Sequence, residues 1–147
     1  MLRLFRNYLQ GRELRRDLLA FYAEARQNLE LYYVMFQLGR LRFFPMASWE
    51  KVKTRHAWAP QISEYGRRLT FYNQTQKDYK VYEQWYNENL ENKNQENGRI
   101  LHHKRELAQE QFKDLEAVIK SGAAQVEWEL VQMKILKSPA PAAFFVN

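Results

Sequence analysis

The histidines are the residues of this sequence with the clearest potential for chemistry, and their spacing does not suit a metal site. Helical proteins that bind two irons use Glu-x-x-His on two helices, and no Glu-x-x-His occurs here. His102 and His103 are adjacent, so on a helix they point about 100° apart. His102 and Glu106 share a helix face but supply only two ligands, and His56 is distant from both in the sequence. We therefore expect neither a metal nor another cofactor.

Short catalytic motifs are missing as well. The 147 residues contain no Gly-rich phosphate loop, no Gly-x-Ser-x-Gly turn and no His-Glu-x-x-His. Because the sequence has no cysteine, it forms no disulfide, no thiolate nucleophile and no Cys-ligated zinc site. Carboxylates and tyrosines from distant segments are able to form acid–base pairs that one sequence does not reveal, so catalysis stays an alternative. We interpret the chain as non-catalytic.

Aromatic side chains, at 15% of the sequence, offer a second kind of chemistry. At helical spacing they usually form core, but buried tyrosine hydroxyls need hydrogen-bond partners and also suit a cleft for a small amphipathic ligand. The residues that would line such a cleft are Tyr32, Trp49, Trp58, Tyr65, Tyr72 and Tyr79. Asn28 and Asn73 lie beside the same apolar positions. We interpret both as polar groups bonded between helices, with ligand contact as the alternative.

Positive charge is concentrated at the N-terminus. Residues 1 to 16 contain five arginines and one glutamate and so carry +4 of the formal +6; the arginines are Arg3, Arg6, Arg12, Arg15 and Arg16. A nucleic-acid surface more often spreads its basic charge along a groove, so we consider a nucleic-acid partner unlikely. We expect these arginines to contact an anionic surface, either a membrane or an acidic protein partner.

Residues 1 to 12 form a basic amphipathic segment, with Leu2, Phe5 and Leu9 opposite Arg3 and Arg6. Its apolar arc is displaced by about 130° from the apolar positions that follow, more than the drift of a straight helix explains. Either Gly11 breaks the helix or this arc serves another surface. The alternatives are a turn packed on the end of the domain, a membrane contact, a subunit contact or a targeting peptide.

Long helices must position all of these side chains. Few glycines or prolines and no alternating β-branched stretches are present, so we predict an all-α fold. Steps of three and four residues put one apolar face on a first helix; its members are Leu14, Leu18, Phe21, Ala25, Leu29, Tyr32 and Phe36. We predict that this helix ends between Gly39 and Pro45.

Three further helices follow from the same reasoning. Ser48 is predicted to cap a short helix over 49–56, and Pro60 to start a helix that runs to about Leu90. The asparagine-rich segment 87–98 predicts a reversal. The last helix runs from about Leu101 to Leu136, with a break near Gly122 as the alternative.

The predicted architecture is an elongated antiparallel bundle of three long helices and one short helix over residues 13–137, or a four-helix bundle if the last helix breaks near Gly122. Residues 138–147 are predicted to form an irregular tail. No apolar run approaches the roughly 18 residues that span a bilayer. Localisation is not determined by the sequence; we favour the cytoplasm, with association at a membrane as the alternative.

Three short motifs carry a resemblance to a known class of domain. Asn28-Leu29-Glu30, Ser48-Trp49-Glu50 and the helix from Tyr65 to Tyr72-Asn73 resemble a pattern in uncharacterised bacterial helical-bundle domains that follow a membrane anchor. The resemblance covers about residues 18–75, and serine replaces the alanine that precedes the tryptophan in that pattern. It implies a membrane-proximal module of unknown function and assigns no catalytic residue.

Taken together, these features favour a non-catalytic helical interaction or scaffolding module that self-associates, a homo-oligomer, near an anionic surface. The apolar N-terminal arc and Phe144-Phe145-Val146 support self-association, because one small bundle leaves such groups uncovered. The alternative function is a sensor-like bundle that binds a small amphipathic ligand in the aromatic-lined cleft described above.

Overall fold

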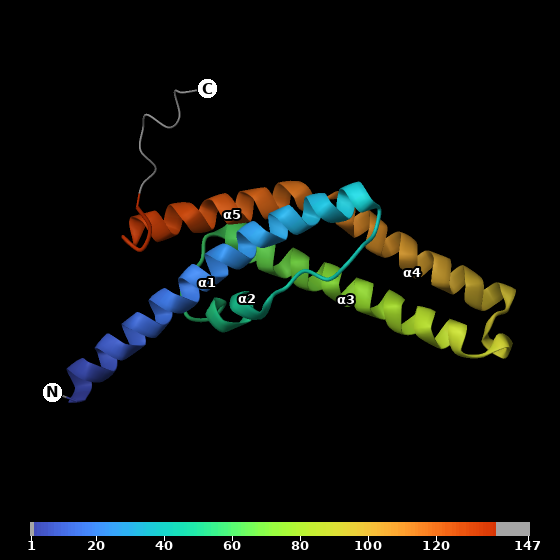
Figure 1. The fold of residues 1–147 in the computed structure, drawn as a ribbon, viewed down its shortest axis with the longest axis horizontal. Helices are drawn as coiled ribbons and strands as arrows, with labels where there is room; N and C mark the ends of the chain where they lie inside the picture. The colour runs from blue at the N-terminus through green and yellow to red at the C-terminus, as the bar shows by residue number, and fades with distance from the viewer. Residues whose placement is uncertain (1, 138–147) are drawn as a thin grey trace, which may run out of the picture.

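A computed structural model describes residues 2–137 of this chain, and most of them are in helices (Figure 1). The described residues contain no β-strand, and the prediction of an all-α fold is confirmed. The elements are α1 (Leu2–Leu38), α2 (Ala47–Val52), α3 (Pro60–Glu88), the single 3-10 turn η1 (Leu90–Asn92), α4 (Gln95–Lys113) and α5 (Leu115–Gln132). The predicted tail 138–147 lies outside the described residues.

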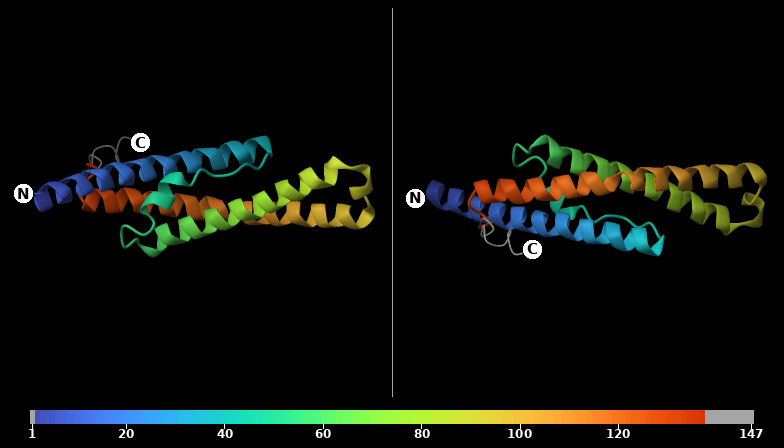
Figure 2. Two further views of the ribbon diagram at one scale, coloured as in Figure 1. Left: turned by 90° about the horizontal axis from the view of Figure 1, so that it is seen from below. Right: turned by 90° about the horizontal axis from the view of Figure 1, so that it is seen from above.

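The helices form an elongated molecule whose two ends differ. Helix α5 packs on both α1 and α3, and α4 packs antiparallel to α3. The views in Figures 1 and 2 show that α1 stops well short of the turn between α3 and α4, while its own N-terminal turns project at the other end. We call the two-helix part beyond the end of α1, residues 77–107, the arm. The arm therefore lacks the third helix that covers the rest of α3.

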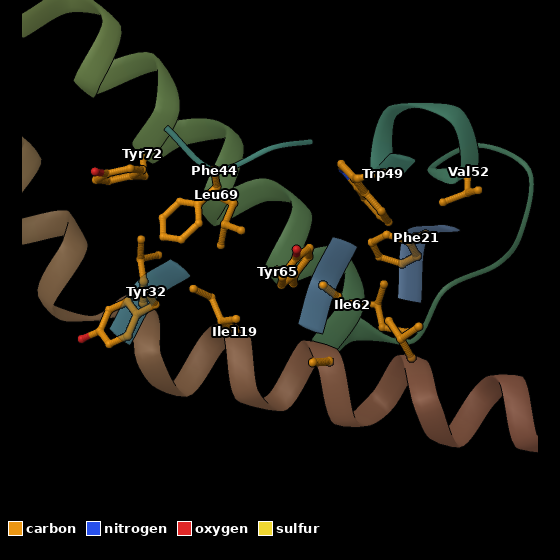
Figure 3. Close-up of a cluster of buried hydrophobic side chains, with 14 of the residues drawn as sticks. Phe21, Tyr32, Phe44, Trp49, Val52, Ile62, Tyr65, Leu69, Tyr72 and Ile119 are labelled. Carbon is orange, nitrogen blue, oxygen red and sulfur yellow. The ribbon is translucent and has the colours of Figure 1, made fainter. Parts of the chain in front are cut away.

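One continuous core joins α1, α2, α3 and α5. Its largest fully buried side chains include Phe21, Phe44, Tyr65, Tyr72 and Ile119, drawn in Figure 3. Close approach of the helices depends on two glycines. A Cβ at Gly122 of α5 would lie 2.6 Å from the Cβ of Tyr65, and a Cβ at Gly66 of α3 would lie 2.2 Å from the indole of Trp49.

Helix α1 runs without a break through Gly11, so that glycine is not a helix boundary. The helix ends at Leu38, and Gly39 takes φ +65°, a left-handed conformation that glycine adopts without steric cost. Most of the predicted apolar face from Leu18 to Tyr32 is buried, with Leu29 half-buried. Phe36 is an exception with 68% of its surface exposed, because at this turn Met35 faces the core instead.

The N-terminus of α2 is capped from another helix. The prediction that Ser48 caps it is wrong: the helix starts at Ala47, and no local side chain makes a capping bond. The carboxylate of Glu24 on α1 instead accepts hydrogen bonds from the backbone N–H groups of Ser48 (2.9 Å) and Trp49 (3.1 Å). Those are two of the donors that every helix N-terminus leaves unpaired. The buried glutamate thus attaches α2 to α1.

The reversal and the last helix differ in detail from the predictions. The asparagine-rich segment does turn the chain, and the side chain of Asn94 caps α4 by accepting from the N–H of Asn97 (2.8 Å). The final helical stretch breaks at Asp114, not near Gly122. Gly122 lies inside α5, where its missing side chain makes room for Tyr65, so the glycine allows close packing and does not break the helix.

Candidate functional site

The predicted aromatic residues lie mostly inside the core. Tyr32, Trp49, Tyr65 and Tyr72 are buried, and Trp58 is half-buried against Phe21. Their rings contact further aromatic rings: Phe21 lies 5.3 Å from Trp49 and 6.0 Å from Tyr65, and Tyr32 stacks on Phe112 at 4.5 Å. Tyr79 is separate from this cluster and lines a polar pocket near the start of the arm. The structure thus places five of the six side chains in packing positions.

The polar atoms of Tyr65, Tyr72 and Trp58 bond within the protein. The Tyr65 hydroxyl accepts from the side-chain amide of Asn28 (2.8 Å), and the Tyr72 hydroxyl donates to the carbonyl of Arg42 (2.8 Å). The Trp58 indole N–H donates to the carbonyl of Val52 (3.0 Å). Burial raises the pKa of Tyr65 and of Tyr72 above the usual tyrosine value, because a charged phenolate is disfavoured away from water.

A set of polar side chains fixes the connection between α1 and α2. The amide of Asn28 also donates to the carbonyl of Pro45 (2.9 Å), while Asn73 accepts from the N–H of Phe44 (2.9 Å) and donates to its carbonyl (2.8 Å). The interpretation of the two asparagines as structural groups agrees with these contacts. Four residues of the resemblance described above thus help to hold one loop and one short helix; they are Asn28, Trp49, Tyr65 and Asn73.

Of the N-terminal arginines, Arg12, Arg15 and Arg16 are exposed on α1, and the side chains of Arg3 and Arg6 lie outside the described part. Arg16 reaches Asp17 at 3.8 Å, with 76% of its own side chain exposed. Asp17 is also paired with Arg55, which ties α1 to the segment after α2. The exposed arginines leave the N-terminal part of α1 basic on its solvent side.

The histidines occupy helix and loop surfaces. His102 pairs with Glu106 at 2.8 Å on α4, as their spacing predicts, and His56 lies 3.7 Å from Glu129. Glu129 also accepts from the N–H of Ala59 (3.1 Å) just before α3. Within residues 2–137 no three side chains of metal-ligating type cluster, and no helix is apolar enough over its length to cross a bilayer.

Exposed apolar side chains gather on one side of the arm. Val81 and Trp85 of α3 have 60% and 41% of their surface exposed, and with Tyr82 they line a shallow groove whose α4 wall is Lys104. The ammonium of Lys104 lies 5.6 Å from the centre of the Tyr82 ring, and the Tyr82 and Trp85 rings lie 5.3 Å apart. The groove is therefore a mainly apolar surface bordered by charge.

Helix α4 extends the same surface. Ile100 and Leu107 lie four residues before and three residues after Lys104, so the three side chains share one face of α4. Their exposed fractions of 39% and 38% show that both remain in contact with solvent. We call Val81, Trp85, Ile100 and Leu107 the arm face. Sequence reasoning missed it because the tyrosine-rich periodicity of α3 indicated a helix with one buried face along its whole length.

The arm face differs from scattered surface hydrophobics because no third helix within residues 2–137 packs on this part of α3 and α4. At the level of Tyr65, side chains of α1, α2 and α5 surround α3. Beyond Gln76, α4 is the only long helix of the described chain beside it, and the loop after α1 borders the other side of α3 as far as Lys80. Two helices without a third bury only the narrow seam between them, here Tyr82 and Tyr86 against Lys104 and Gly98. Apolar groups outside that seam stay in contact with water.

No protein-family model, no curated protein and no solved structure compared with this chain shows significant similarity to it.

Proposed function

We propose that this chain is a non-catalytic helical interaction module, and that its arm docks on the arm of a second copy. The arm face carries the proposal: three aliphatic side chains and one tryptophan are exposed together on a part of the molecule that is only two helices thick. Contiguous apolar surface of this kind, rimmed by charge, is typical of protein–protein contacts.

A second copy is the occupant that the geometry and charge favour. Two helical hairpins that pack through their open sides complete a four-helix bundle, in which each hairpin supplies the missing layer of the other. Between Lys77 and Glu106 the arm contains six basic and six acidic residues, so two arms meet without net repulsion. The same residues would pair with themselves across a two-fold axis.

The expected dimer is weak. From Lys77 to Glu88, α3 contributes 12 residues to the arm, or roughly 18 Å of helix. A face of this length buries about the smallest area that gives specific association, so we expect a dimer that dissociates on dilution. Dimer formation is therefore measured on the full chain over a series of increasing protein concentrations.

The test compares two tryptophans. Trp85 is 41% exposed on the arm face and Trp128 is 57% exposed on α5, away from the arm. We expect Trp85→Lys to weaken the dimer at least ~30-fold, because a central interface tryptophan typically contributes about 2 kcal/mol or more. Trp128→Lys, with the same change in charge and size, leaves association unchanged. Light scattering over a concentration series measures both.

A monomeric wild-type chain at millimolar concentration would contradict the self-association proposal, as would equal effects of the two tryptophan substitutions. In the first case the arm face would have to serve a different protein. Circular dichroism of each variant verifies that the helices remain, so that a loss of association is not a loss of fold.

The opposite end of the molecule supports a second part of the proposal, that the module lies near an anionic surface. Leu2 and Leu4 are 79% and 74% exposed where α1 projects beyond the core. Arg12, Arg15 and Arg16 follow them on the same helix and are exposed. A helix with exposed leucines and arginines suits the boundary of an anionic membrane, where apolar groups insert and guanidinium groups reach phosphates.

A further inference from the structure

A basic pocket lies where α1 ends and the arm begins. Its volume is about 400 Å³, and its walls are the loop after α1, helix α3 and helix α4. It contains four cationic side chains: Arg40 and Arg42 from the loop, Lys80 from α3 and Arg105 from α4. None of the described residues that line it carries a carboxylate. Small-molecule sites typically measure about 300 to 1,000 Å³, so the pocket is large enough for a ligand.

The pocket exists because the third helix stops. Helix α1 ends at Leu38, and Gly39 turns the chain back so that residues 39–46 run beside α3 toward α2 (Figure 1). Up to Gln76 the inner face of α3 is covered by core side chains. One turn later, at Lys80, the loop after α1, with its long basic side chains, takes the place of α1 beside α3. A space remains between this loop, α3 and α4.

The loop that carries two of the cations is held in place. The hydroxyl of Tyr72 donates to the carbonyl of Arg42 (2.8 Å), and the side-chain amide of Gln76 donates to the carbonyl of Leu41 (3.3 Å). The backbone N–H of Arg42 lies 3.0 Å from the sulfur of Met35. Because these contacts fix the backbone on both sides of the arginine, the pocket is formed before any ligand arrives, which reduces the entropic cost of binding.

Gln76 also leaves a polar atom unused. Its side chain is 2% exposed and lines the pocket, and its carbonyl oxygen Oε1 has no hydrogen-bond partner. A buried amide oxygen without a donor costs about 1 to 3 kcal/mol, so such groups are rare in folded proteins. Because this oxygen is itself shielded from solvent, a hydroxyl or amino group of a ligand in the pocket meets it only when the Gln76 side chain turns toward the pocket.

A carboxylate beside the pocket modifies its charge without cancelling it. Glu83 lies one helical turn beyond Tyr79, accepts the hydrogen bond of the Tyr79 hydroxyl and is 3.5 Å from Lys80. That hydrogen bond, together with Lys80 and Arg105, keeps the pKa of Glu83 below its usual range, so this group is charged at neutral pH. One negative charge then faces four positive ones. Arg40, Arg42 and Arg105 form no ion pair with any described carboxylate.

We propose that this pocket binds a small organic phosphate, whose anionic group contacts Arg40, Arg42 and Arg105 while the Gln76 side chain turns its Oε1 toward a hydroxyl or amino group of the ligand. Guanidinium groups bind phosphate through paired, charge-assisted hydrogen bonds, which are the strongest polar contacts available here. The pocket is on the opposite side of α3 from the arm face, since Trp85 is nine residues, or about 180°, from Gln76. Ligand binding and self-association therefore use separate surfaces.

The test is a calorimetric titration of the full chain with glucose 6-phosphate, with inorganic phosphate and glucose as comparison ligands. We expect saturable binding of glucose 6-phosphate, weaker binding of inorganic phosphate and none of glucose. The difference between the two phosphates measures the contribution of hydroxyl groups. Substituting Gln76→Met, which keeps the volume but removes the acceptor, should make the two phosphates bind equally.

The charge requirement is tested with a matched pair of arginines on α4. Arg105→Gln removes a pocket cation, and we expect it to weaken glucose 6-phosphate binding about tenfold or more. Arg99→Gln makes the same change of charge on the same helix outside the pocket and should change binding less than twofold. Equal weakening by both variants, or no saturable binding of either phosphate at millimolar concentration, would overturn the proposal. If Gln76→Met does not fold, the wild-type comparison of the two phosphates still tests the hydroxyl contact.

A phosphate ester reaches such a pocket either free in solution or as a lipid headgroup. Vesicles that contain a phosphoinositide distinguish the two sources when they are added to the complex with glucose 6-phosphate. Displacement by these vesicles, and not by phosphatidylcholine vesicles, assigns the pocket to the headgroup. Absence of displacement assigns it to a free ester. In both cases Arg105→Gln should weaken the competition or the binding.

Discussion

Single buried side chains attach the irregular parts of this chain to its helices. Glu24 satisfies two backbone donors of α2, and Asn28 links α1 to α3 through Tyr65 and to the loop through Pro45. Each contact joins residues far apart in the sequence, and each satisfies a polar group that burial would otherwise make costly. Polar residues of the interior therefore determine where the loop and α2 lie.

The buried tyrosines predict loss of stability at alkaline pH. Burial raises the pKa of Tyr65 and Tyr72 in the folded protein above the value of about 10 found in unfolded chains. Above pH 10 the unfolded chain releases these protons and the folded protein keeps them, so the free energy of unfolding decreases as pH rises. The stabilising contribution of the two protonated tyrosines is fully present below pH 10. It is lost as the pH rises through their pKa values in the folded protein.

Urea denaturation from pH 8 to 11.5 measures this effect. Each of the two tyrosines contributes a slope of up to about 1.4 kcal/mol per pH unit above pH 10. Tyr72→Phe removes one titrating group and should flatten the curve by that amount above pH 10. Below pH 9 its curve should run parallel to that of the wild type, offset by the lost hydrogen bond to Arg42. Parallel curves over the whole range would show that Tyr72 ionises equally in both states.

At the level of elements, glycines have different roles in helices of similar regularity. Gly122 is buried in α5 against Tyr65, whereas nothing lies within 4 Å of a Cβ built at Gly11 in α1. Helix propensity favours alanine over glycine by up to about 1 kcal/mol at both positions. Tertiary contact alone distinguishes the two sites.

Alanine substitutions at these glycines should therefore have opposite signs. Gly122→Ala puts a methyl group 2.6 Å from the Cβ of Tyr65 and forces α3 and α5 apart, for which we expect a net destabilisation of about 1 to 3 kcal/mol. Gly11→Ala should leave stability unchanged or raise it by up to about 1 kcal/mol. Thermal denaturation of both variants provides the comparison. A stabilised Gly122→Ala variant would mean that α5 packs less closely on α3 than described here.

At the scale of the whole molecule, the core occupies the middle and each end projects from it. The first fully buried residue described in α1 is Leu18, so the preceding turns contribute little to the core. The arm extends at the other end of the molecule, past the point where α1 stops at Leu38. A domain built this way presents separate surfaces at its two ends while one core maintains the fold.

Removal of residues 1–12 tests the proposed anionic contact of the N-terminal end. The shortened chain should keep its helical circular dichroism and melt within a few degrees of the full chain, because the described core starts after residue 12. Each basic group near an anionic leaflet contributes about 1 kcal/mol, so the full chain should co-sediment with anionic vesicles, and the shortened chain less. Added salt should weaken the interaction, since exposed charges are screened over about 10 Å at 0.1 M. Equal sedimentation of both chains, or none, would eliminate a membrane contact by this segment.

Local patterns in the sequence determined the all-α fold, the end of α1 at Gly39, the start of α3 at Pro60 and the reversal before α4, because apolar spacing, glycine and proline act over a few residues. Only the tertiary structure decided that Glu24 replaces Ser48 as the cap of α2 and that the last helical stretch breaks at Asp114. The arm face and the basic pocket were likewise decided only by the tertiary structure. Both result from where α1 stops relative to α3 and α4, a length difference between distant elements that no local spacing encodes.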